Sequence, residues 1–435
     1  RNCICTQHPK PFNPLGGQLK EECAAYPPDT IWSYSNLGIT LLGVMVEQVT
    51  GSNFSAYAER QLLKPLGMVD SRFSEALIGK NTSKAYKKDE EKTEIPIRDT
   101  PAGGLNANVL DMSRFIKMVL ADGQTNRKQI LKPESLNEML RPQNQKVGLD
   151  VGFQIGLGWL LHNDPSIGTI AGHGGATMYH QSQLSLLREH KLGVIVAANS
   201  PSDLPLKIAN KALKLATAIK TGKSIPFDDE KPEADYRPLT PQELQKAAGQ
   251  YATQYGYVKL TADGGELTAE LDGNRVDLLA RQDGKLIMRY KLFGLIPIPI
   301  DELADLALSL PTINGHAAVV ANGQGQDFLV GEKITPVNIS PIWQKRVGDY
   351  EIINLAGGDG FVPQNCSLKE RDGFLMLEYS VPEFELNNLS VPIAAVSDSE
   401  ALILGLGAGK QETLRFVRTD GKELLAYSGY LLRKK

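Results

Sequence analysis

The stretch Tyr34-Ser35-Asn36-Leu37-Gly38 lies where an irregular polar segment gives way to an apolar helix. The prolines of Tyr26-Pro27-Pro28-Asp29-Thr30 exclude a helix before it, because each proline fixes φ and disfavours the α region in its predecessor. After it, apolar residues recur at helical spacing up to Gly51, which suits a left-handed helix end. We therefore expect a buried helix over residues 37–50, preceded by a tight loop. Its apolar positions are Leu37, Leu41, Leu42, Met45, Val46 and Val49.

That loop carries Tyr34 and Asn36. A phenol and a carboxamide there can line a cleft as a proton carrier and a hydrogen-bonding clamp. A lone Tyr-x-Asn is far more often ordinary turn chemistry, so the functional interpretation needs partners elsewhere in the chain.

The composition bounds the class of protein. Of 435 residues, 42% are hydrophobic and 22% charged, which is typical of a globular protein of about three domains. The net charge of −3 gives no reason to expect nucleic acid or an anionic membrane surface as a partner. No apolar run is long enough to span a membrane. The four cysteines match no metal-binding spacing, so we expect neither a metal nor a cofactor.

Helical periodicity dominates the chain up to about residue 150, and strand periodicity follows. A second helix is expected after Asn53 and should stop at Pro65. Another begins at Asn108, with Asp111 placed as in a capping box. Four antiparallel strands are then expected, over residues 156–160, 169–176, 179–187 and 192–199. A last helix over residues 204–219 should cover this sheet.

The remaining half of the chain has an all-β texture, with short alternating runs separated by Asp-Gly turns. It contains an expected repeat, in which Gly249-Gln250-Tyr251 matches Gly348-Asp349-Tyr350 and Gln282-Asp283-Gly284 matches Arg371-Asp372-Gly373. We predict an α+β fold, an antiparallel sheet covered by helices and then two all-β barrel-like domains. The predicted boundaries are 1–222 for the first domain, 223–240 for a linker, and 241–339 and 340–435 for the two barrels.

Three groups of residues stand in order along the first domain: Tyr34-Ser35-Asn36, the turn with Gly103 and Gly104, and His173-Gly174-Gly175-Ala176. Together they resemble the serine β-lactamase-like family, the penicillin-recognising hydrolases that include class C β-lactamases, D-alanyl-D-alanine peptidases and related esterases. The resemblance covers roughly residues 10–200 and also runs through Leu66-Gly67-Met68 and Gly156-Leu157-Gly158-Trp159. It implies a partial β-lactamase/transpeptidase-like domain and an extracytoplasmic location, periplasmic or secreted.

The resemblance also implies roles for these residues. Tyr34 would share a proton with the motif lysine and pass it to the leaving group, and Asn36 would hold the substrate amide. His173 occupies the place of the lysine in Lys-Thr-Gly. Gly103, Gly104, Gly174, Gly175 and Ala176 would bind the substrate, with the Ala176 N–H as an oxyanion donor.

The Ser-x-x-Lys motif of the family is not in this sequence, since no serine has a lysine three residues later. The family places this motif before Tyr-x-Asn and the chain begins at Arg1, so we expect a member truncated before its nucleophile, with any signal peptide also upstream. Part of the sheet should then be absent, and its open edge would be covered by the missing segment or by a second copy of the chain.

Two hypotheses follow from the sequence. The first is the C-terminal part of a serine hydrolase that acts on a small amide or ester, such as a D-amino-acid peptide or a β-lactam, with this chain alone inactive. The second is a non-catalytic protein that binds a ligand or partner on the same scaffold. The two β domains resemble the lipocalin-like domains often appended to this family, either as substrate-shaping modules or as passive caps.

Overall fold

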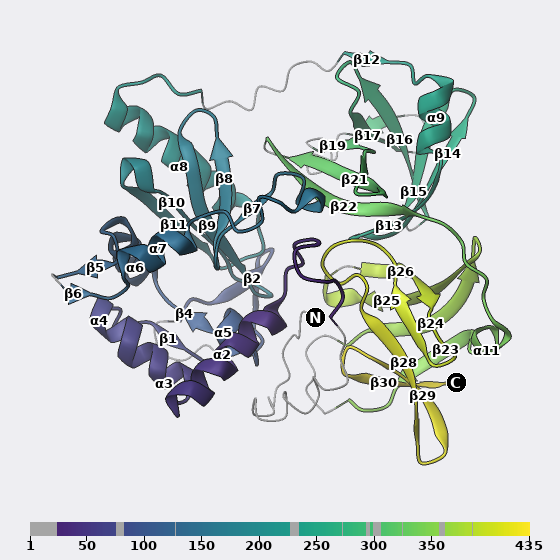
Figure 1. Ribbon diagram of the computed structural model, residues 1–435, viewed down its shortest axis with the longest axis horizontal. Coiled ribbons are helices and arrows are strands. Elements are labelled where there is room, and N and C mark those ends of the chain that lie inside the picture. The colour runs from purple at the N-terminus through teal and green to yellow at the C-terminus, as the bar shows by residue number, and fades with distance from the viewer. Residues whose placement is uncertain are drawn as a thin grey trace.

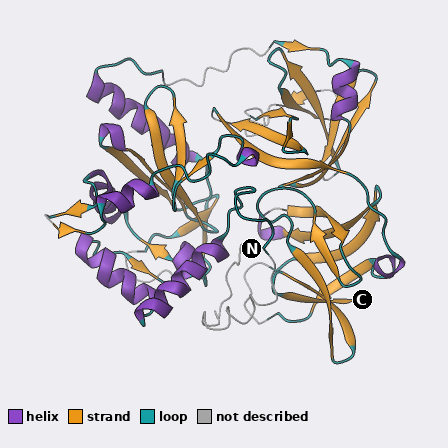
Figure 2. Ribbon diagram, in the orientation of Figure 1, coloured by secondary structure: helices purple, strands orange, loops and turns teal. Residues whose placement is uncertain are grey.

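The computed structural model describes residues 24–74, 82–126, 128–226, 235–271, 273–292, 296–298, 306–323, 325–355, 362–384 and 386–435. The helices and one antiparallel sheet gather on one side of the molecule, and two β-barrels occupy the other side (Figures 1 and 2). The α+β prediction is therefore confirmed. No helix in the described part of the chain combines the length and the apolar character needed to cross a membrane.

Helix α2 (Asn36–Thr50) begins and ends as the sequence predicts. The Ser35 hydroxyl accepts a hydrogen bond from the Gly38 N–H at 3.0 Å and caps the helix. Gly51 ends it in the left-handed region at φ 65°. Ser35 therefore has a structural role in the Tyr-x-Asn stretch.

The predicted burial of α2 is wrong. Thr40 and Gly43 are its buried residues, whereas Met45 and Val49 are 60% and 86% exposed. The helix meets α5 (Thr100–Gly103) through a glycine, because a Cβ on Gly43 would lie 2.2 Å from Pro101 Cγ. Its fully buried residues are thus small ones, while Leu37, Leu41 and Val46 are half-buried and the rest of the predicted apolar stripe is exposed.

The second helical segment does not stop at Pro65. It runs through α3 (Phe54–Ala58), a π-helical turn (Glu59–Leu63) and α4 (Lys64–Leu66), and ends at Gly67 with φ 71°. A proline donates no N–H and crowds the carbonyl four residues before it in an α-helix. The wider π turn just before Pro65 accommodates it without ending the helix.

Helix α6 (Val109–Leu120) is capped by Asn108, whose side chain accepts from the Asp111 N–H at 2.9 Å. The predicted cap is confirmed, but the reciprocal half of the capping box is not. The buried Asp111 carboxylate instead accepts from Ser71 Oγ at 2.8 Å and the Asp70 N–H at 2.9 Å. Asp111 thus ties α6 to the turn after α4.

The sheet of the first domain has the order β11-β10-β9-β8-β7, and every pair is antiparallel. Leu186 packs with Ile116 of α6, and the next residue, Leu187, packs with Leu213 of α8, so the two helices cover opposite faces. No described strand pairs with the outer edge of β11. The bounds are β7 Gln154–Ile155, β8 Leu160–Asp164, β9 Gly168–Ala176, β10 Gln181–Leu187, β11 Leu192–Ala198 and α8 Leu204–Thr221.

One predicted strand is wrong, since residues 156–159 form the turn between β7 and β8. Gly158 has φ 78°, a conformation that strand residues do not adopt. The smaller elements around the sheet are β1 Arg72–Phe73, β2 Ala85–Lys87, β3 Glu90–Lys92, β4 Leu105–Asn106, β5 Gln124–Thr125, β6 Lys128–Gln129 and α7 Pro133–Met139.

The first barrel follows helix α9 (Pro241–Ala247) and closes because β13 pairs with both β14 and β22 while β16 pairs with β17. Short strands β12 (Tyr236–Arg237), β18 (Ile296–Ile298) and β20 (Thr312–Ile313) add to its margins. The barrel strands are β13 Gly249–Thr253, β14 Gly256–Asp263, β15 Glu266–Leu271, β16 Asn274–Arg281, β17 Leu286–Leu292, β19 Ala307–Ser309, β21 His316–Gly323 and β22 Gln326–Ile334.

The second barrel follows helix α11 (Pro341–Gln344) and is closed from β23 round to β30. Trp343 of that helix is fully buried in the core at one end of the barrel. The strands are β23 Gly348–Ile352, β24 Gln364–Arg371, β25 Phe374–Val381, β26 Leu386–Ala395, β27 Glu400–Ile403, β28 Thr413–Thr419, β29 Lys422–Tyr427 and β30 Tyr430–Lys434.

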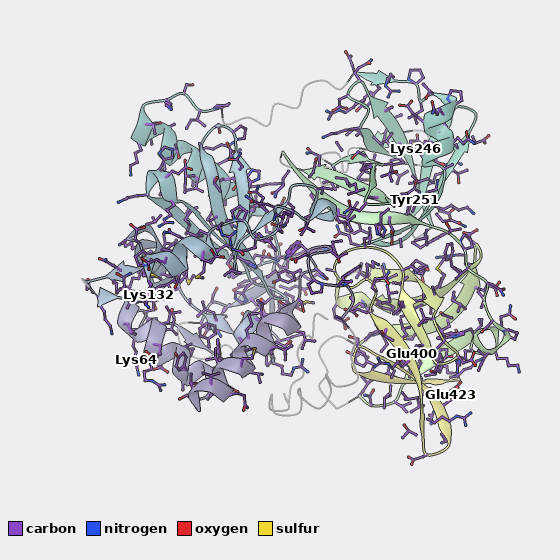
Figure 3. The ribbon with its side chains drawn as sticks, viewed as in Figure 1. Lys64, Lys132, Lys246, Tyr251, Glu400 and Glu423 are labelled. Carbon is purple, nitrogen blue, oxygen red and sulfur yellow. The ribbon has the colours of Figure 1, made fainter. Side chains whose placement is uncertain are left out.

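The first strand of each barrel carries a tyrosine that makes the same hydrogen bond. The Tyr251 hydroxyl donates to the Ala247 carbonyl at 2.6 Å, and the Tyr350 hydroxyl donates to the Arg346 carbonyl at 2.6 Å (Tyr251 in Figure 3). Each tyrosine thereby closes the short helix onto the first strand of its barrel. The predicted match between these two Gly-x-Tyr sequences is confirmed.

The second predicted match is wrong. Asp283-Gly284 lies between β16 and β17, the fourth and fifth strands of the first barrel. Asp372-Gly373 lies between β24 and β25, the second and third strands of the second barrel. The structural equivalent of the latter is Asp263-Gly264, between β14 and β15. Asp-Gly turns are too general a signal to fix which hairpins correspond.

Candidate active site

The chain segment that leads to Tyr34 is fixed by its neighbour Trp32. The Trp32 N–H donates to Asp150 Oδ1 at 2.6 Å, and the indole stacks on Phe153 with ring centroids 4.8 Å apart and planes at 26°. Asp150 is buried and also accepts from Asn144 Nδ2 at 2.6 Å. These contacts hold the loop before α2 against the turn that precedes β7.

Tyr34 and His173 are brought together as predicted. Their ring centroids are 6.2 Å apart with planes at 34°, one ring on the loop before α2 and the other on β9. Tyr34 is 39% exposed, and partial burial raises the pKa of its phenol.

The orientation of His173 defines which nitrogen can act as a base. Nδ1 lies 2.5 Å from the Gly174 carbonyl oxygen. A carbonyl oxygen only accepts, so Nδ1 carries the proton in this contact. In the neutral imidazole the lone pair then lies on Nε2, which is the nitrogen able to accept a proton or a hydrogen bond.

Asn36 is the first residue of α2 and directly follows the Ser35 cap. Its side chain is half-buried, and it sits two residues from Tyr34. The carboxamide therefore lies on the first residue of the helix, directly after the loop that carries the phenol. The Tyr-x-Asn pair is thus held by one local structure.

The turn that contains Gly103 and Gly104 is held by close packing and by a backbone hydrogen bond. A Cβ on Gly104 would lie 2.8 Å from Thr100 Cα, and its carbonyl accepts from the Ser74 N–H at 2.8 Å. The turn is packed through α5 against α2. The structure thus places the Gly103-Gly104 turn beside α2, the helix that Tyr34 precedes.

The end of β9 offers exposed backbone. Gly174, Gly175 and Ala176 are exposed, and β8 pairs with β9 only as far as Gly172. The Thr177 N–H points across the hairpin to the His180 carbonyl at 2.9 Å. Because the direction of the N–H groups alternates along an antiparallel strand, the Ala176 N–H points away from β10, to a side where no described strand receives it.

The paired glycines also make room for neighbouring side chains. A Cβ on Gly175 would lie 2.6 Å from Ser182 Oγ, and one on Gly174 would lie 3.1 Å from Gln183 Oε1. A side chain at either position would therefore displace the Ser182 or Gln183 side chain of β10.

A residue that the sequence did not single out holds the turn beyond Ala176. The Glu94 carboxylate accepts from Thr177 Oγ1 at 2.7 Å, the Tyr179 N–H at 3.1 Å and His180 Nδ1 at 2.8 Å. Burial opposes its ionisation, but these hydrogen bonds outweigh burial and lower the pKa of Glu94. No local sequence signal marks this role, because its partners lie more than 80 residues away.

In the described part of the chain, no three His, Cys, Asp or Glu side chains gather as possible metal ligands. What the described residues provide is a phenol beside an imidazole, a carboxamide on the same loop and an outward strand N–H. A proton carrier, a polar clamp and an oxyanion donor suit acyl transfer.

The fold and the order of these elements are those of a β-lactamase-like scaffold. A family model described as Beta-lactamase matches residues 10–219. Penicillin-binding protein 4* of Bacillus subtilis (strain 168) is 22% identical over 284 residues, 61% of this chain and 61% of that protein. Protein flp of Staphylococcus aureus (strain N315) is 23% identical over 197 residues, 42% of this chain and 36% of that protein. The matched stretch therefore spans 61% of the first of these relatives and 36% of the second, less than two thirds of either.

The crystal structure of SurE superimposes with a TM-score of 0.51 at 20% identity and covers 73% of this chain and 72% of that chain. At this identity the likeness concerns the fold alone. Residues 10–219 belong to the β-lactamase and penicillin-binding-protein-like family.

Proposed function

We propose that this chain supplies the tyrosine, asparagine and β9 side of a serine hydrolase site that cleaves a small amide or ester through an acyl-enzyme. The observation that carries the proposal is the contact between Tyr34 and His173, with Nε2 of the imidazole as the available base. Tyr34 would relay the proton of the nucleophile to the leaving group. Asn36 would orient the substrate amide, and the Ala176 N–H would stabilise the developing oxyanion.

Residues 1–435 contain no serine with a lysine three positions later. We therefore propose that this chain on its own performs no covalent hydrolysis, since losing the nucleophile of such a site costs on the order of a millionfold in rate. The alternative function, a non-catalytic protein that binds ligands on the same scaffold, is favoured by this same absence.

The experiment is to incubate residues 1–435 with a fluorescent penicillin and, separately, with a fluorophosphonate, followed by intact-mass spectrometry. We expect no adduct from this chain alone. A protein that also carries a Ser-x-x-Lys segment before Tyr34 should form a stoichiometric adduct on that serine. A stoichiometric adduct on any serine of residues 1–435 would refute the proposed inactivity, and no adduct on the longer protein would favour the ligand-binding alternative.

A further inference from the structure

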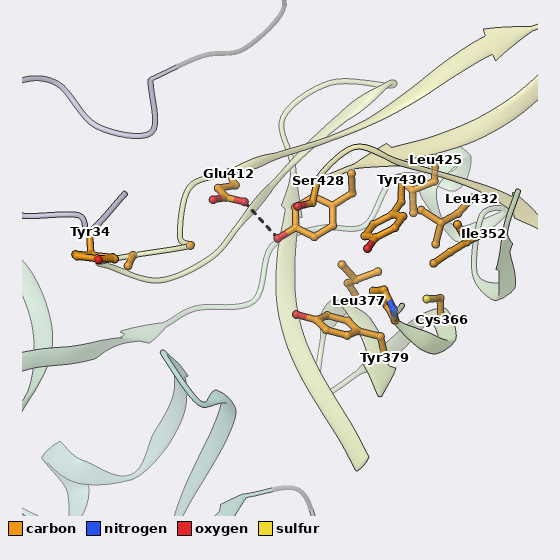
Figure 4. A pocket seen from close by; sticks show the side chains of 14 residues that line it. Tyr34, Ile352, Cys366, Leu377, Tyr379, Glu412, Leu425, Ser428, Tyr430 and Leu432 are labelled. Carbon is orange, nitrogen blue, oxygen red and sulfur yellow. Dashed lines mark hydrogen bonds between the residues drawn. The ribbon is translucent and has the colours of Figure 1, made fainter. Parts of the chain in front are cut away.

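A cavity in the second barrel opens beside Tyr34. It encloses about 320 Å³, and all of its lining residues except Tyr34 belong to that barrel (Figure 4). Because Tyr34 forms part of its wall, this cavity is an extension of the candidate active site. A separate surface of the first domain, the outer edge of β11 with the adjoining flank of α8, is exposed in the described part of the chain.

Every second residue of β11 directs its backbone groups outward. The direction of these groups alternates along an antiparallel strand, and the registers of β9–β10 and β10–β11 contain no bulge. Counted from the bond between the Thr177 N–H and the His180 carbonyl, the N–H and C=O groups of Gly193, Ile195 and Ala197 point away from β10. No described strand pairs with these three residues on that side.

β11 lacks the features that usually protect an exposed edge. Its seven residues include no charged residue and no proline, and none of them is buried, although helices cover both faces of the sheet. Edge strands are commonly short, charged or interrupted by proline, because free N–H and C=O groups pair readily with another chain. The Tyr86 N–H donates to the Asn199 carbonyl at 2.9 Å and so limits the free edge to β11 itself.

Beside this edge, α8 carries a stripe of exposed apolar side chains. The members are 49% to 76% exposed and fall within a sector of about 60°, because successive helix residues lie about 100° apart: Leu204, Ile208, Leu215 and Ile219. Lys214 lies on the other flank of α8 and forms an ion pair with Asp164 of β8 at 3.3 Å. Since β8 and the free edge lie on opposite sides of β10, the stripe faces the edge of β11.

The stripe is symmetric along the sequence. Two antiparallel helices related by a twofold axis bring together residues whose numbers have a constant sum. With the axis at the middle of the stripe, Leu204 of one copy faces Ile219 of the other, and Ile208 faces Leu215. The stripe is therefore complementary to itself.

The edge of β11 is symmetric in the same way. In an antiparallel β11–β11 pair, Ile195 faces its own copy and Gly193 faces Ala197, so all three outward residues find partners. α8 runs back along β11, because Lys220 Nζ in its last turn donates to the His190 carbonyl just before the strand at 2.7 Å. From that bond, the middle of the stripe lies roughly 13 Å along the helix and the middle of the edge roughly 16 Å along the strand. One twofold axis can therefore serve both.

We propose that two copies of this chain associate about such an axis, with β11 pairing with β11 and α8 packing against α8. The same surface serves both copies, so the contact closes as a dimer. The antiparallel helices oppose their dipoles, and Asp203 at the start of α8 comes level with the last turn of the other copy, which carries Lys220. A lipid surface would cover the stripe but leave the peptide groups of β11 unpaired. The inference does not depend on the proposed function.

The mass of residues 1–435 in solution tests the pairing. Light scattering after size-exclusion chromatography should give twice the 47.5 kDa of the chain, and sedimentation equilibrium gives the dissociation constant. Ile208→Lys and Leu215→Glu should each raise this constant about a hundredfold, tenfold for each of the two symmetric contacts that lose an aliphatic partner. The double variant should return to within about tenfold of the parent value, because each introduced positive charge then faces an introduced negative charge.

A further variant tests the strand. Ala197→Pro should also weaken the dimer, because it removes one outward N–H and leaves the hydrogen bonds between β10 and β11 intact. Its control is Ala197→Ser, which keeps the N–H. The control for the α8 variants is Leu157→Glu, since Leu157 is 49% exposed in the turn between β7 and β8, at the other edge of the sheet. A circular dichroism spectrum identical to that of the parent chain shows that each variant is folded.

A monomeric parent chain would overturn the inference. If that monomer binds a synthetic segment that carries Ser-x-x-Lys, the surface belongs to such a segment and not to a second copy. A double variant as weak as the single ones would exclude the antiparallel contact of α8, and an unchanged dissociation constant in Ala197→Pro would exclude pairing through β11. Equal weakening by Leu157→Glu would show that the contact lies elsewhere. Each of these results overturns the inference.

Discussion

Replacing Glu94 by glutamine tests whether one buried carboxylate holds the turn after β9. The Glu94 side chain is 5% exposed, and Oε2 alone accepts from Thr177 Oγ1, the Tyr179 N–H and His180 Nδ1. Oε1 accepts from the Met178 N–H at 3.2 Å and from the Ile95 N–H at 3.2 Å. Glutamine keeps the size of the side chain but replaces one oxygen with an NH₂ group, which faces a donor that it cannot bind.

The expected cost is that of one charge-assisted hydrogen bond in a buried site, about 2 kcal/mol. At 1.4 kcal/mol for each factor of ten, the opening equilibrium of the turn should rise about thirtyfold. Because the turn is a local structure at the end of a hairpin, the increase should be confined to it, while the sheet core keeps its stability.

The assay is hydrogen–deuterium exchange with peptide-level mass spectrometry, comparing residues 175–181 with β10 and β11. Glu91→Gln is the control, because Glu91 is half-exposed and its ion pair with Lys84, at 2.7 Å, lies away from the turn. Unchanged exchange over residues 175–181 in Glu94→Gln would refute the reasoning. Equal acceleration across the whole sheet would refute the claim that the turn opens on its own.

The same carboxylate predicts a pH dependence. The pKa of Glu94 is lowered in the folded protein, so its stabilisation is fully present above the pKa of an unfolded glutamate and is lost as pH falls through the folded value. Protection of the turn, corrected for intrinsic exchange, should therefore decrease on acidification in the parent chain. In Glu94→Gln it should stay low and constant over the same range.

Three further substitutions test the packing of α2 against α5 and the roles proposed for Tyr34 and His173. Gly43→Ala should destabilise the first domain by about 1–3 kcal/mol in urea unfolding, because the new Cβ would lie 2.2 Å from Pro101 Cγ; an unchanged midpoint would show that α2 can move off α5 freely. In a protein that also carries Ser-x-x-Lys, Tyr34→Phe should lower kcat about 10²- to 10⁴-fold with folding unchanged, whereas His173→Lys should retain activity with a shifted pH profile of kcat/KM. Near-normal turnover of Tyr34→Phe would show that the Tyr34 hydroxyl carries no proton and that the ring only lines the site.

The sequence predicts the ends of α2 well and its environment badly, for a physical reason. Helix ends depend on local chemistry, the Ser35 hydroxyl and the left-handed Gly51, which are readable from neighbours in the chain. Burial depends on which surfaces meet in the folded protein. The helix turns Thr40 and Gly43 toward its neighbours, and its Met45 and Val49 stripe stays exposed.

In the candidate site too, local motifs could be predicted from the sequence and long-range contacts could not. Motif order is enough to pair Tyr34 with His173, because each motif carries its own loop or strand geometry. The role of Glu94 is set by contacts across more than 80 residues, and no periodicity or motif encodes it. The cavity near Tyr34 is equally unreadable, since it needs the relative placement of a loop and a barrel.

Tyr34 is the residue on which the separate parts of this protein converge. Asp150 and Phe153 fix its approach through Trp32, and Tyr26 bonds the same segment to the loop of the second barrel. The segment that carries Tyr34 is therefore bonded both to the first domain and to the second barrel, so a displacement of that barrel would pull on the chain that leads to the phenol.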